Sequence, residues 1–166
     1  LPVILYNVPS RTVADLQNET VLRLAEIPNI VGLKESTSNI ERVTNLMKQM
    51  PEGFLVFSGN DDAALAYILL GAKGVISVTA NVAPKQMAKM CAAALAGDLP
   101  AAIAANNELL GLHRNLFLEA NPIPAKWALQ KMGRIAEGIR LPLTPFASQY
   151  HDALLDALRE AGIPLN

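Results

Sequence analysis

Short apolar runs alternate with helix-like segments through the first part of the chain. The apolar runs lie at Val3–Val8, Ile30–Glu35, Phe54–Phe57 and Gly74–Val78. They are rich in aliphatic and β-branched residues and too short for helices, so we expect four strands. Apolar residues at helical spacing follow each run, at 18–26, 40–50, 63–70 and from Pro84 onward. The pattern therefore predicts four successive strand–helix units.

This alternation is typical of a parallel α/β fold. The strands are continuously apolar, which is typical of strands covered on both faces. No glycine-rich dinucleotide fingerprint follows the first strand and no phosphate-binding loop occurs, which argues against a nucleotide site. A doubly wound sheet and a (β/α)8 barrel both remain compatible with the pattern. A complete barrel needs about 250 residues, so four units would be half of one.

After the fourth unit the pattern becomes wholly helical. Helices are predicted at Pro84–Ala96, Pro100–Leu118, Pro124–Met132 and Ala147–Ala161. We therefore expect a partial barrel over residues 1–97 and a C-terminal helical domain over residues 98–166. The sequence opens inside a strand, which we interpret as a sign that it is the later part of a longer chain.

Composition narrows the function classes. The 166 residues are 51% hydrophobic with a formal net charge of −1, and no basic run or secretory signal pattern is present. Nucleic acid and anionic membranes are therefore poor candidates for partners. Apolar stretches are interrupted well before the ~20 residues that a membrane-spanning helix needs. The single cysteine, Cys91, excludes a disulfide framework and fits a cytoplasmic setting.

Candidate chemistry gathers where the predicted strands end, because parallel α/β folds place their sites there. Lys34 stands near the end of the second apolar run, and Tyr6 near the end of the first. Lys34 is either the first solvated residue after its strand or a desolvated amine kept for chemistry. A neutral amine could capture a keto acid as a Schiff base, with the nearby phenol moving protons. Tyr6 could equally be a strand-end residue that packs its ring.

Other polar residues have two explanations each. Arg11, just beyond Tyr6, could bind a substrate carboxylate or form a surface ion pair. Asp61 and Asp62 could bind a metal, but N-capping of the next helix is the simpler interpretation. His113 and His151 have no partner at ligand spacing, so both are interpreted as structural or surface residues.

Five motifs together resemble one enzyme family. They are Tyr6-Asn-Val-Pro-Ser-Arg-Thr, Gly32-Leu-Lys-Glu, Ser58-Gly-Asn-Asp, Gly74-Val-Ile-Ser-Val and Asn121-Pro-Ile-Pro. In this order and spacing they resemble the 4-hydroxy-tetrahydrodipicolinate synthase family, among the pyruvate-dependent Schiff-base aldolases and N-acetylneuraminate lyases. The resemblance implies a (β/α)8 barrel followed by a helical domain, a homotetramer, no cofactor, and a step of lysine and diaminopimelate synthesis.

The resemblance also implies roles for individual residues. Lys34 would form the Schiff base with pyruvate, and Tyr6 would relay protons. Arg11 would receive the carboxylate of L-aspartate 4-semialdehyde, and Ile76 would contact pyruvate. N-acetylneuraminate lyases tend to lack an arginine at the position of Arg11, which favours the synthase. A sugar-acid aldolase and a non-catalytic fragment that keeps only assembly contacts remain as alternatives.

The chain departs from the family in one large respect. The first half of the family's barrel is missing, and with it a threonine and a second tyrosine of the proton relay, the loop that binds the pyruvate carboxylate, and the lysine feedback site. Half a barrel would expose strand edges and apolar surface. We therefore expect a companion segment or a second copy to cover them.

Overall fold

The computed structural model describes residues 1–165 as two compact units. The first unit comprises Leu1–Ser77 and Ala94–Asp98, and the second comprises Val78–Ala93 and the residues from Leu99 onward. The predicted boundary between residues 97 and 98 stays a prediction about the whole protein, and Asn166 lies outside the described residues.

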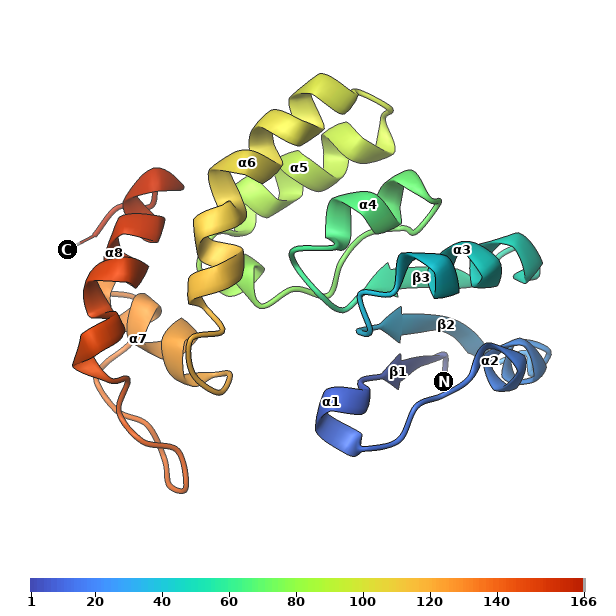
Figure 1. Ribbon diagram of the computed structural model, residues 1–166, viewed down its shortest axis with the longest axis horizontal. Coiled ribbons are helices and arrows are strands. Elements are labelled where there is room, and N and C mark those ends of the chain that lie inside the picture. The colour runs from blue at the N-terminus through green and yellow to red at the C-terminus, as the bar shows by residue number, and fades with distance from the viewer. Residues whose placement is uncertain (166) are drawn as a thin grey trace. The chain divides into compact units, whose positions relative to one another are not determined.

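The described part of the first unit contains a parallel sheet of three strands in the order β1-β2-β3 (Figure 1). The strands are β1 (Val3–Asn7), β2 (Ile30–Glu35) and β3 (Leu55–Ser58). Three of the four predicted strands are therefore confirmed, to within one residue at either end. Their parallel pairing confirms the α/β class.

The fourth predicted strand, at Gly74–Val78, does not form as a strand. Val75 makes an isolated parallel bridge to Ser58, supported by backbone hydrogen bonds of 2.9 Å from Ser58 N–H to Gly74 O and from Ile76 N–H to Ser58 O. The pairing ends there because Val78 already has helical dihedral angles, at the start of the 3-10 helix η1 (Thr79–Asn81).

Four helices of the first unit are described: α1 (Pro9–Thr12), α2 (Asn18–Ala25), α3 (Ile40–Gln49) and α4 (Ala64–Leu69). Asn39 caps α3, accepting the Arg42 N–H at 2.9 Å. Gln17 occupies the N-cap of α2, while Asn18 lies inside the helix and donates to Arg42 O at 3.0 Å.

The capping interpretation of Asp61 and Asp62 is wrong. Ala63 is the N-cap of α4, and its side chain makes no cap hydrogen bond. The short helix α1 was not predicted. It begins at Pro9, whose fixed φ suits a first helical position, and it ends at Val13, which has a φ of 57°.

The core of the first unit lies between the sheet and the helices that follow its strands. Fully buried side chains come from each layer: Val21 and Val43 and Leu46 from the helices, Leu33 and Val56 from the strands, and Tyr67 from α4. Each such aliphatic side chain contributes about 1.5–3 kcal/mol through its removal from water. This packing holds one face of the sheet against α2, α3 and α4. The other face carries Ile4 and Tyr6, which are 43% and 53% exposed. Among the described residues, the predicted coverage of both faces of the sheet is therefore confirmed for one face only.

The second unit is helical, as predicted after residue 98. Its elements are α5 (Pro84–Leu95, of which the last two residues group with the first unit), α6 (Leu99–Asn115), α7 (Ile123–Lys131), the 3-10 helix η2 (Ser148–Tyr150) and α8 (His151–Glu160). Helices α6 and α8 pack through fully buried leucines on both. Gly111 permits their close approach, because a β-carbon there would lie 3.1 Å from Ala157 Cβ. His113 is buried and lies 2.9 Å from the Thr79 hydroxyl through Nδ1, which supports its structural interpretation.

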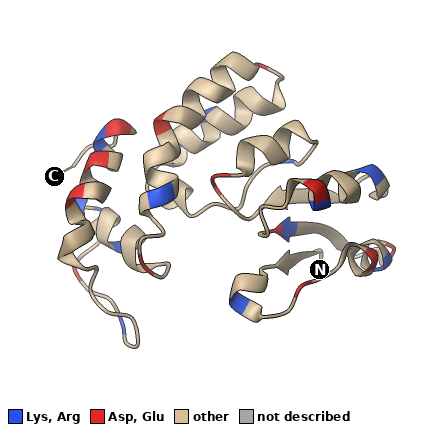
Figure 2. Cartoon of the chain, in the orientation of Figure 1, with Lys and Arg blue, Asp and Glu red and all other residues tan. Residues whose placement is uncertain are grey.

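Surface charge is mixed in sign. Figure 2 shows acidic and basic residues interspersed along the helices. None of the helices in residues 1–165 has both the length and the apolar character needed to cross a bilayer.

Candidate active site

Tyr6 and Lys34 lie side by side on neighbouring strands. They are register partners in the parallel pairing of β1 with β2, and the Lys34 ammonium nitrogen lies 4.1 Å from the centroid of the Tyr6 ring. Tyr6 is half exposed, whereas Lys34 is partly buried. The structure therefore brings together the amine and the phenol that sequence reasoning paired, on the sheet face that no described helix covers.

The next residue on each strand points the other way. Successive side chains on a strand alternate between faces, so Asn7 and Glu35 lie on the helix-covered face behind Tyr6 and Lys34. Asn7 and Glu35 are register partners too, and they are only 2% and 0% exposed. The candidate pair Tyr6 and Lys34 on one face thus has a buried polar pair on the opposite face.

Two hydrogen-bond donors and one ion-pair partner surround the Glu35 carboxylate. The Asn7 side-chain amide donates to Oε2 at 3.0 Å and to Oε1 at 3.3 Å, and the Thr37 N–H donates to Oε1 at 2.8 Å. The Arg42 guanidinium completes the set, with Nε 3.3 Å from Oε2. A buried charge is tolerated when it is paired and hydrogen-bonded in this way. Glu35 thereby joins the ends of β1 and β2 to helix α3.

The same residues hold the segment that follows β1. The Asn7 side-chain amide also donates to Asp15 at 3.0 Å, and its carbonyl oxygen accepts the Leu16 N–H at 2.9 Å. Arg42 Nη1 lies 2.9 Å from both Asp15 oxygens, and Nη2 donates to Leu16 O. The hydrogen bond from Asn7, helped by the Arg42 charge, holds the pKa of the Asp15 carboxyl below its ordinary value. The far end of the 8–17 segment is therefore fixed to the back of the sheet.

Glycine at position 59 leaves room for Lys34. A β-carbon at Gly59 would overlap the Ser36 hydroxyl and would lie 3.0 Å from Lys34 Cε. The backbone at this point is fixed, because Gly59 N–H donates to Glu35 O at 2.7 Å. The turn after β3 thus forms one wall beside the lysine side chain.

Burial also changes the acidity of Tyr67 behind the sheet. Loss of hydration raises the pKa of its phenol, and the neighbouring Glu35 charge raises it further. Tyr67 is fully buried, so it belongs to the support of the sheet rather than to the open face.

Arg11 and Ile76 lie in the same unit as Lys34. Arg11 is exposed on α1, and Ile76 is 42% exposed beside the end of β3, where its N–H donates to Ser58 O. Their roles toward substrate stay predictions.

Sequence reasoning missed Asn7, Glu35, Arg42 and Gly59 as contributors to the site. A polar residue directly after each candidate catalytic residue was a usable signal, because strand alternation must bury it on the opposite face. Arg42 carried no such signal, since it resembles any charged residue on an amphipathic helix.

Within residues 1–165, no group of three or more histidine, cysteine, aspartate or glutamate side chains is placed to hold a metal ion. Asp61 is buried, at 2% exposure, near the end of β3.

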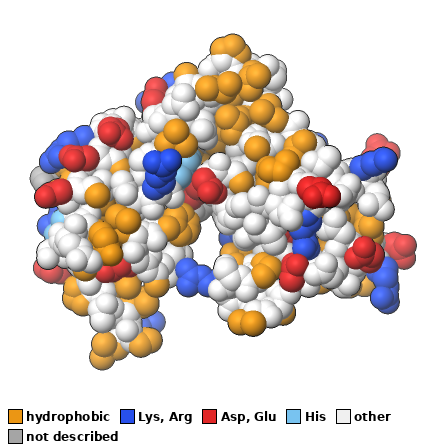
Figure 3. All heavy atoms as spheres, in the orientation of Figure 1, with side chains coloured by type: hydrophobic (Ala, Val, Ile, Leu, Met, Phe, Trp, Pro, Cys, Tyr) orange, Lys and Arg blue, Asp and Glu red, His pale blue; other side chains and the backbone are white. Residues whose placement is uncertain are grey.

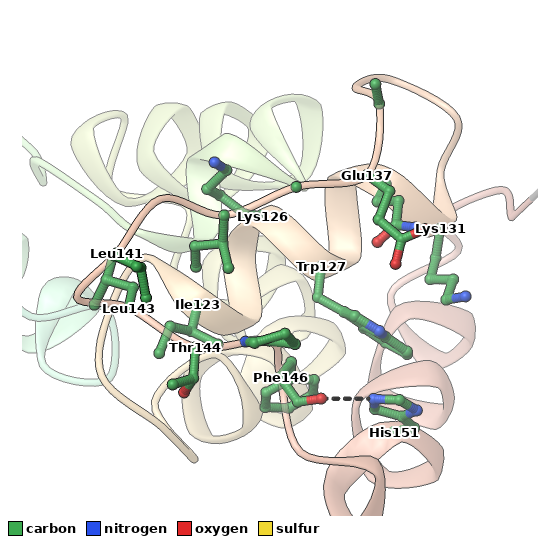
Figure 4. Close-up of a pocket in the computed structure, with 15 residues that line it drawn as sticks. Ile123, Lys126, Trp127, Lys131, Glu137, Leu141, Leu143, Thr144, Phe146 and His151 are labelled. Atoms are coloured by element: carbon green, nitrogen blue, oxygen red, sulfur yellow. Dashed lines mark hydrogen bonds between the residues drawn. The ribbon is translucent and has the colours of Figure 1, made fainter.

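A separate hollow of about 530 Å³ lies in the second unit (Figure 4). Its walls come from α7, the segment 136–146 and the start of α8. His151 stacks on Trp127 with ring centroids 4.4 Å apart and is 3.0 Å from Phe146 O through Nε2. These aromatic contacts connect α7 to α8.

The family of the chain follows from comparison with known proteins. The model of the dihydrodipicolinate synthetase family matches residues 1–161. The chain belongs to the dihydrodipicolinate synthetase family. This confirms the resemblance that the five sequence motifs carried.

Individual relatives agree with this membership. The 4-hydroxy-tetrahydrodipicolinate synthase of Azoarcus sp. strain BH72 is 62% identical over 163 residues, covering 98% of this chain and 56% of the relative. The dihydrodipicolinate synthase of Acinetobacter baumannii, solved in complex with pyruvate, matches with a TM-score of 0.95 and 54% identity over 99% of this chain and 56% of that one. The Aquifex aeolicus enzyme has the same TM-score at 40% identity, with 100% and 57% covered. The chain thus spans about half the length of the relatives it matches.

Proposed function

We propose that the protein is a Schiff-base-forming lyase that condenses pyruvate with L-aspartate 4-semialdehyde to give 4-hydroxy-tetrahydrodipicolinate, in lysine and diaminopimelate synthesis. The placement of the Lys34 amine 4.1 Å from the Tyr6 ring, in a chain of this family, carries the proposal. In the whole protein these strands form the second half of a (β/α)8 barrel, followed by the helical domain.

The proposed chemistry begins with attack of the neutral Lys34 amine on the ketone carbon of pyruvate. The carbinolamine loses water to give an imine, and loss of a methyl proton converts the imine into an enamine. The enamine carbon attacks the aldehyde carbon, and the substrate's own amine then displaces Lys34 as the product cyclises. The Tyr6 hydroxyl shuttles the protons that these steps release and require.

Arg11 is proposed to bind the carboxylate of the aldehyde substrate, and Ile76 to contact pyruvate. A guanidinium binds a carboxylate through two parallel hydrogen bonds, which fixes its orientation. Exposure of Arg11 on α1 leaves its donors available for such a ligand. An arginine at this position also favours the synthase over an N-acetylneuraminate lyase.

The proposed setting is the cytoplasm, and the proposed assembly is a homotetramer in which the remaining half of the barrel covers the open sheet face. Exposed apolar side chains support association: Val3 and Ile4 on β1, and Leu99, Ile103 and Leu110 along one side of α6. Figure 3 shows apolar side chains at the surface over α6.

Borohydride trapping tests the proposed chemistry. The intact gene product is incubated with pyruvate, reduced, digested and mapped by mass spectrometry, which should locate the adduct on Lys34. Lys34→Arg should abolish the adduct and the turnover. Lys48→Arg is the matched control, because it changes an exposed lysine of the same unit and should leave both intact. An unmodified Lys34 in the intact protein would remove the proposal.

A further inference from the structure

We propose that Asn7, Glu35 and Arg42 are positioning residues for the Schiff-base site, a role that rests on the proposed function. They form one buried cluster directly behind Tyr6 and Lys34. Their effect on the reaction is indirect, since they lie on the opposite face of the sheet from the amine and the phenol.

Strand register gives the first argument. Tyr6 pairs with Lys34 and Asn7 pairs with Glu35, so the two couples are consecutive rungs of the same ladder. The Asn7–Glu35 hydrogen bonds of 3.0 and 3.3 Å fix the side chains across this ladder. Any slip of β1 against β2 would break them and separate the Tyr6 ring from the Lys34 amine. The Asn7–Glu35 contact on the helix-covered face therefore fixes the distance between the Tyr6 ring and the Lys34 amine on the open face.

The contacts of Arg42 give the second argument. Its guanidinium spans two carboxylates, with Nε 3.3 Å from Glu35 Oε2 and Nη1 2.9 Å from Asp15. Nη2 also holds the Leu16 carbonyl. Asp15 and Leu16 end the segment that carries Arg11, so one side chain of α3 links the placement of Lys34 to that of Arg11. Arg42 thus connects Lys34, the proposed attachment point of pyruvate, to Arg11, the proposed binding residue of the aldehyde.

Composition of the cluster gives the third argument. Core stability alone would be served by apolar residues at positions 7 and 35, since a buried ion pair is at best a weak source of stability. The directional hydrogen bonds between Asn7 and Glu35, together with the Arg42–Glu35 ion pair, instead fix one geometry. That use of buried polar groups suits a site whose reacting atoms must be held within about 0.5 Å.

Two substitutions in the intact gene product separate positioning from plain stability. Asn7→Asp keeps the size of the side chain but turns the amide donor into a carboxylate that faces Asp15 and Glu35. Leu46→Ala is the control: Leu46 is fully buried on α3 and packs in the apolar core with Val21 and Leu33. Both are assayed at a temperature where circular dichroism shows each protein folded.

We expect Asn7→Asp to lower kcat and the rate of borohydride-trapped adduct at Lys34 by about 10- to 100-fold, the loss typical of a misplacement near 1 Å. Leu46→Ala should lower the melting temperature and change kcat by less than about twofold. Equal losses of kcat in the two variants, or no loss in Asn7→Asp, would overturn the positioning role.

Arg42 variants test the link to Arg11. Arg42→Ala should raise KM for the aldehyde about tenfold more than KM for pyruvate, because it frees the segment that ends at Asp15 and Leu16. Arg42→Lys should restore the adduct rate through its charge beside Glu35, but should leave KM for the aldehyde raised, since an ammonium cannot span both carboxylates. A uniform change in both KM values contradicts the link.

The wild-type trapping result keeps the two proposals apart. If wild type forms the Lys34 adduct and Asn7→Asp behaves like Leu46→Ala, only the positioning role fails. If wild type forms no adduct, the proposed function fails. Crystal structures of Asn7→Asp and wild type then test the positioning role by itself. An unchanged Tyr6–Lys34 geometry in the variant refutes that role, and a displaced Lys34 amine supports it.

Discussion

At the scale of single residues, the space around the Lys34 side chain depends on Gly59. The turn after β3 passes so close that a methyl group there would reach Lys34 Cε and overlap the Ser36 hydroxyl. Neither contact can be relieved by moving the backbone, which is hydrogen-bonded to Glu35 O.

We expect Gly59→Ala to reduce turnover by about tenfold or more, because the added methyl displaces the amine that forms the Schiff base. The rate of pyruvate-dependent borohydride trapping in the intact gene product measures the effect. Gly53→Ala is the control. Gly53 also lies in the first unit, but a β-carbon there meets no atom within 4 Å, so only its φ of 87° is strained. Equal turnover in the wild type and in Gly59→Ala would show that the wall at position 59 is not needed.

Tyr6→Phe removes the hydroxyl that is proposed to shuttle protons and keeps the ring that lies beside Lys34. Tyr6→Phe should lower kcat by about 10²–10⁴-fold, the usual contribution of a positioned acid or base, while the ring beside Lys34 remains. Steady-state kinetics of the intact gene product provide the measurement. Tyr150→Phe, in the second unit, should leave kcat at the wild-type value. A Tyr6→Phe variant with normal kcat would assign the proton transfers to another group.

At the scale of elements, the 8–17 segment has few apolar anchors and depends on charge for its attachment. Its Asp15 carboxylate contacts Asn7 and Arg42 on the sheet and on α3. Because the folded-state pKa of Asp15 is lowered, its contribution to stability is fully present above the ordinary value of 3.8. That contribution is lost as the pH falls through the lowered folded-state value.

We therefore expect Asp15→Asn to destabilise the protein by no more than about 1 kcal/mol at neutral pH, since the side chain is 39% exposed and water screens its charge. The difference from wild type should shrink toward zero as acid protonates Asp15. Urea unfolding at a series of pH values tests this. Glu52→Gln removes an exposed carboxylate without a contact to Asn7 and serves as the control. A difference that persists unchanged in strong acid would contradict the charge-based attachment.

The sequence predicted elements better than it predicted their ends and their contacts. Periodicity located β2 to the residue, because Pro28-Asn29 precede its apolar run and a polar run from Ser36 to Asn39 follows it. A strand at Gly74–Val78 was predicted wrongly, because apolar character does not show that the chain turns into η1 after a single bridge. The cap predicted at Asp61 and Asp62 was wrong because α4 begins later, with Ala63 as its N-cap.

The candidate site shows the same limit. Tyr6 and Lys34 could be paired from the sequence because consecutive parallel strands are neighbours and their ends meet. Arg42 could not be connected to them, since it is distant in the chain from Asp15 and only the packed structure brings the two within 2.9 Å.

At the scale of the whole molecule, exposed apolar surface is the main feature left by the described residues. On α6, Leu99, Ile103 and Leu110 are each 40–43% exposed and recur at helical spacing. Such a row on one side of a helix is typical of a surface that another chain covers.

We expect Ile103→Asp to weaken self-association of the intact gene product, because it places a charge within this apolar row. Sedimentation velocity should show a shift toward smaller species. Ala104→Asp adds the same charge at an exposed position of the same helix, away from the apolar row, and should leave the distribution unchanged. A sedimentation profile of Ile103→Asp identical to that of the wild type would exclude this side of α6 from the assembly.

Alternation along β1 and β2 has a consequence for how this protein can change over time. In the dipeptides Tyr6-Asn7 and Lys34-Glu35, the first side chain lies on the open face of the sheet and the second lies on the helix-covered face. Substitutions can adjust either partner alone, but a single insertion or deletion upstream within the strand exchanges their sides at once. Insertions and deletions in these two strands should therefore be tolerated far less often than amino-acid replacements. A deep mutational scan that includes single-codon insertions and deletions would measure this difference.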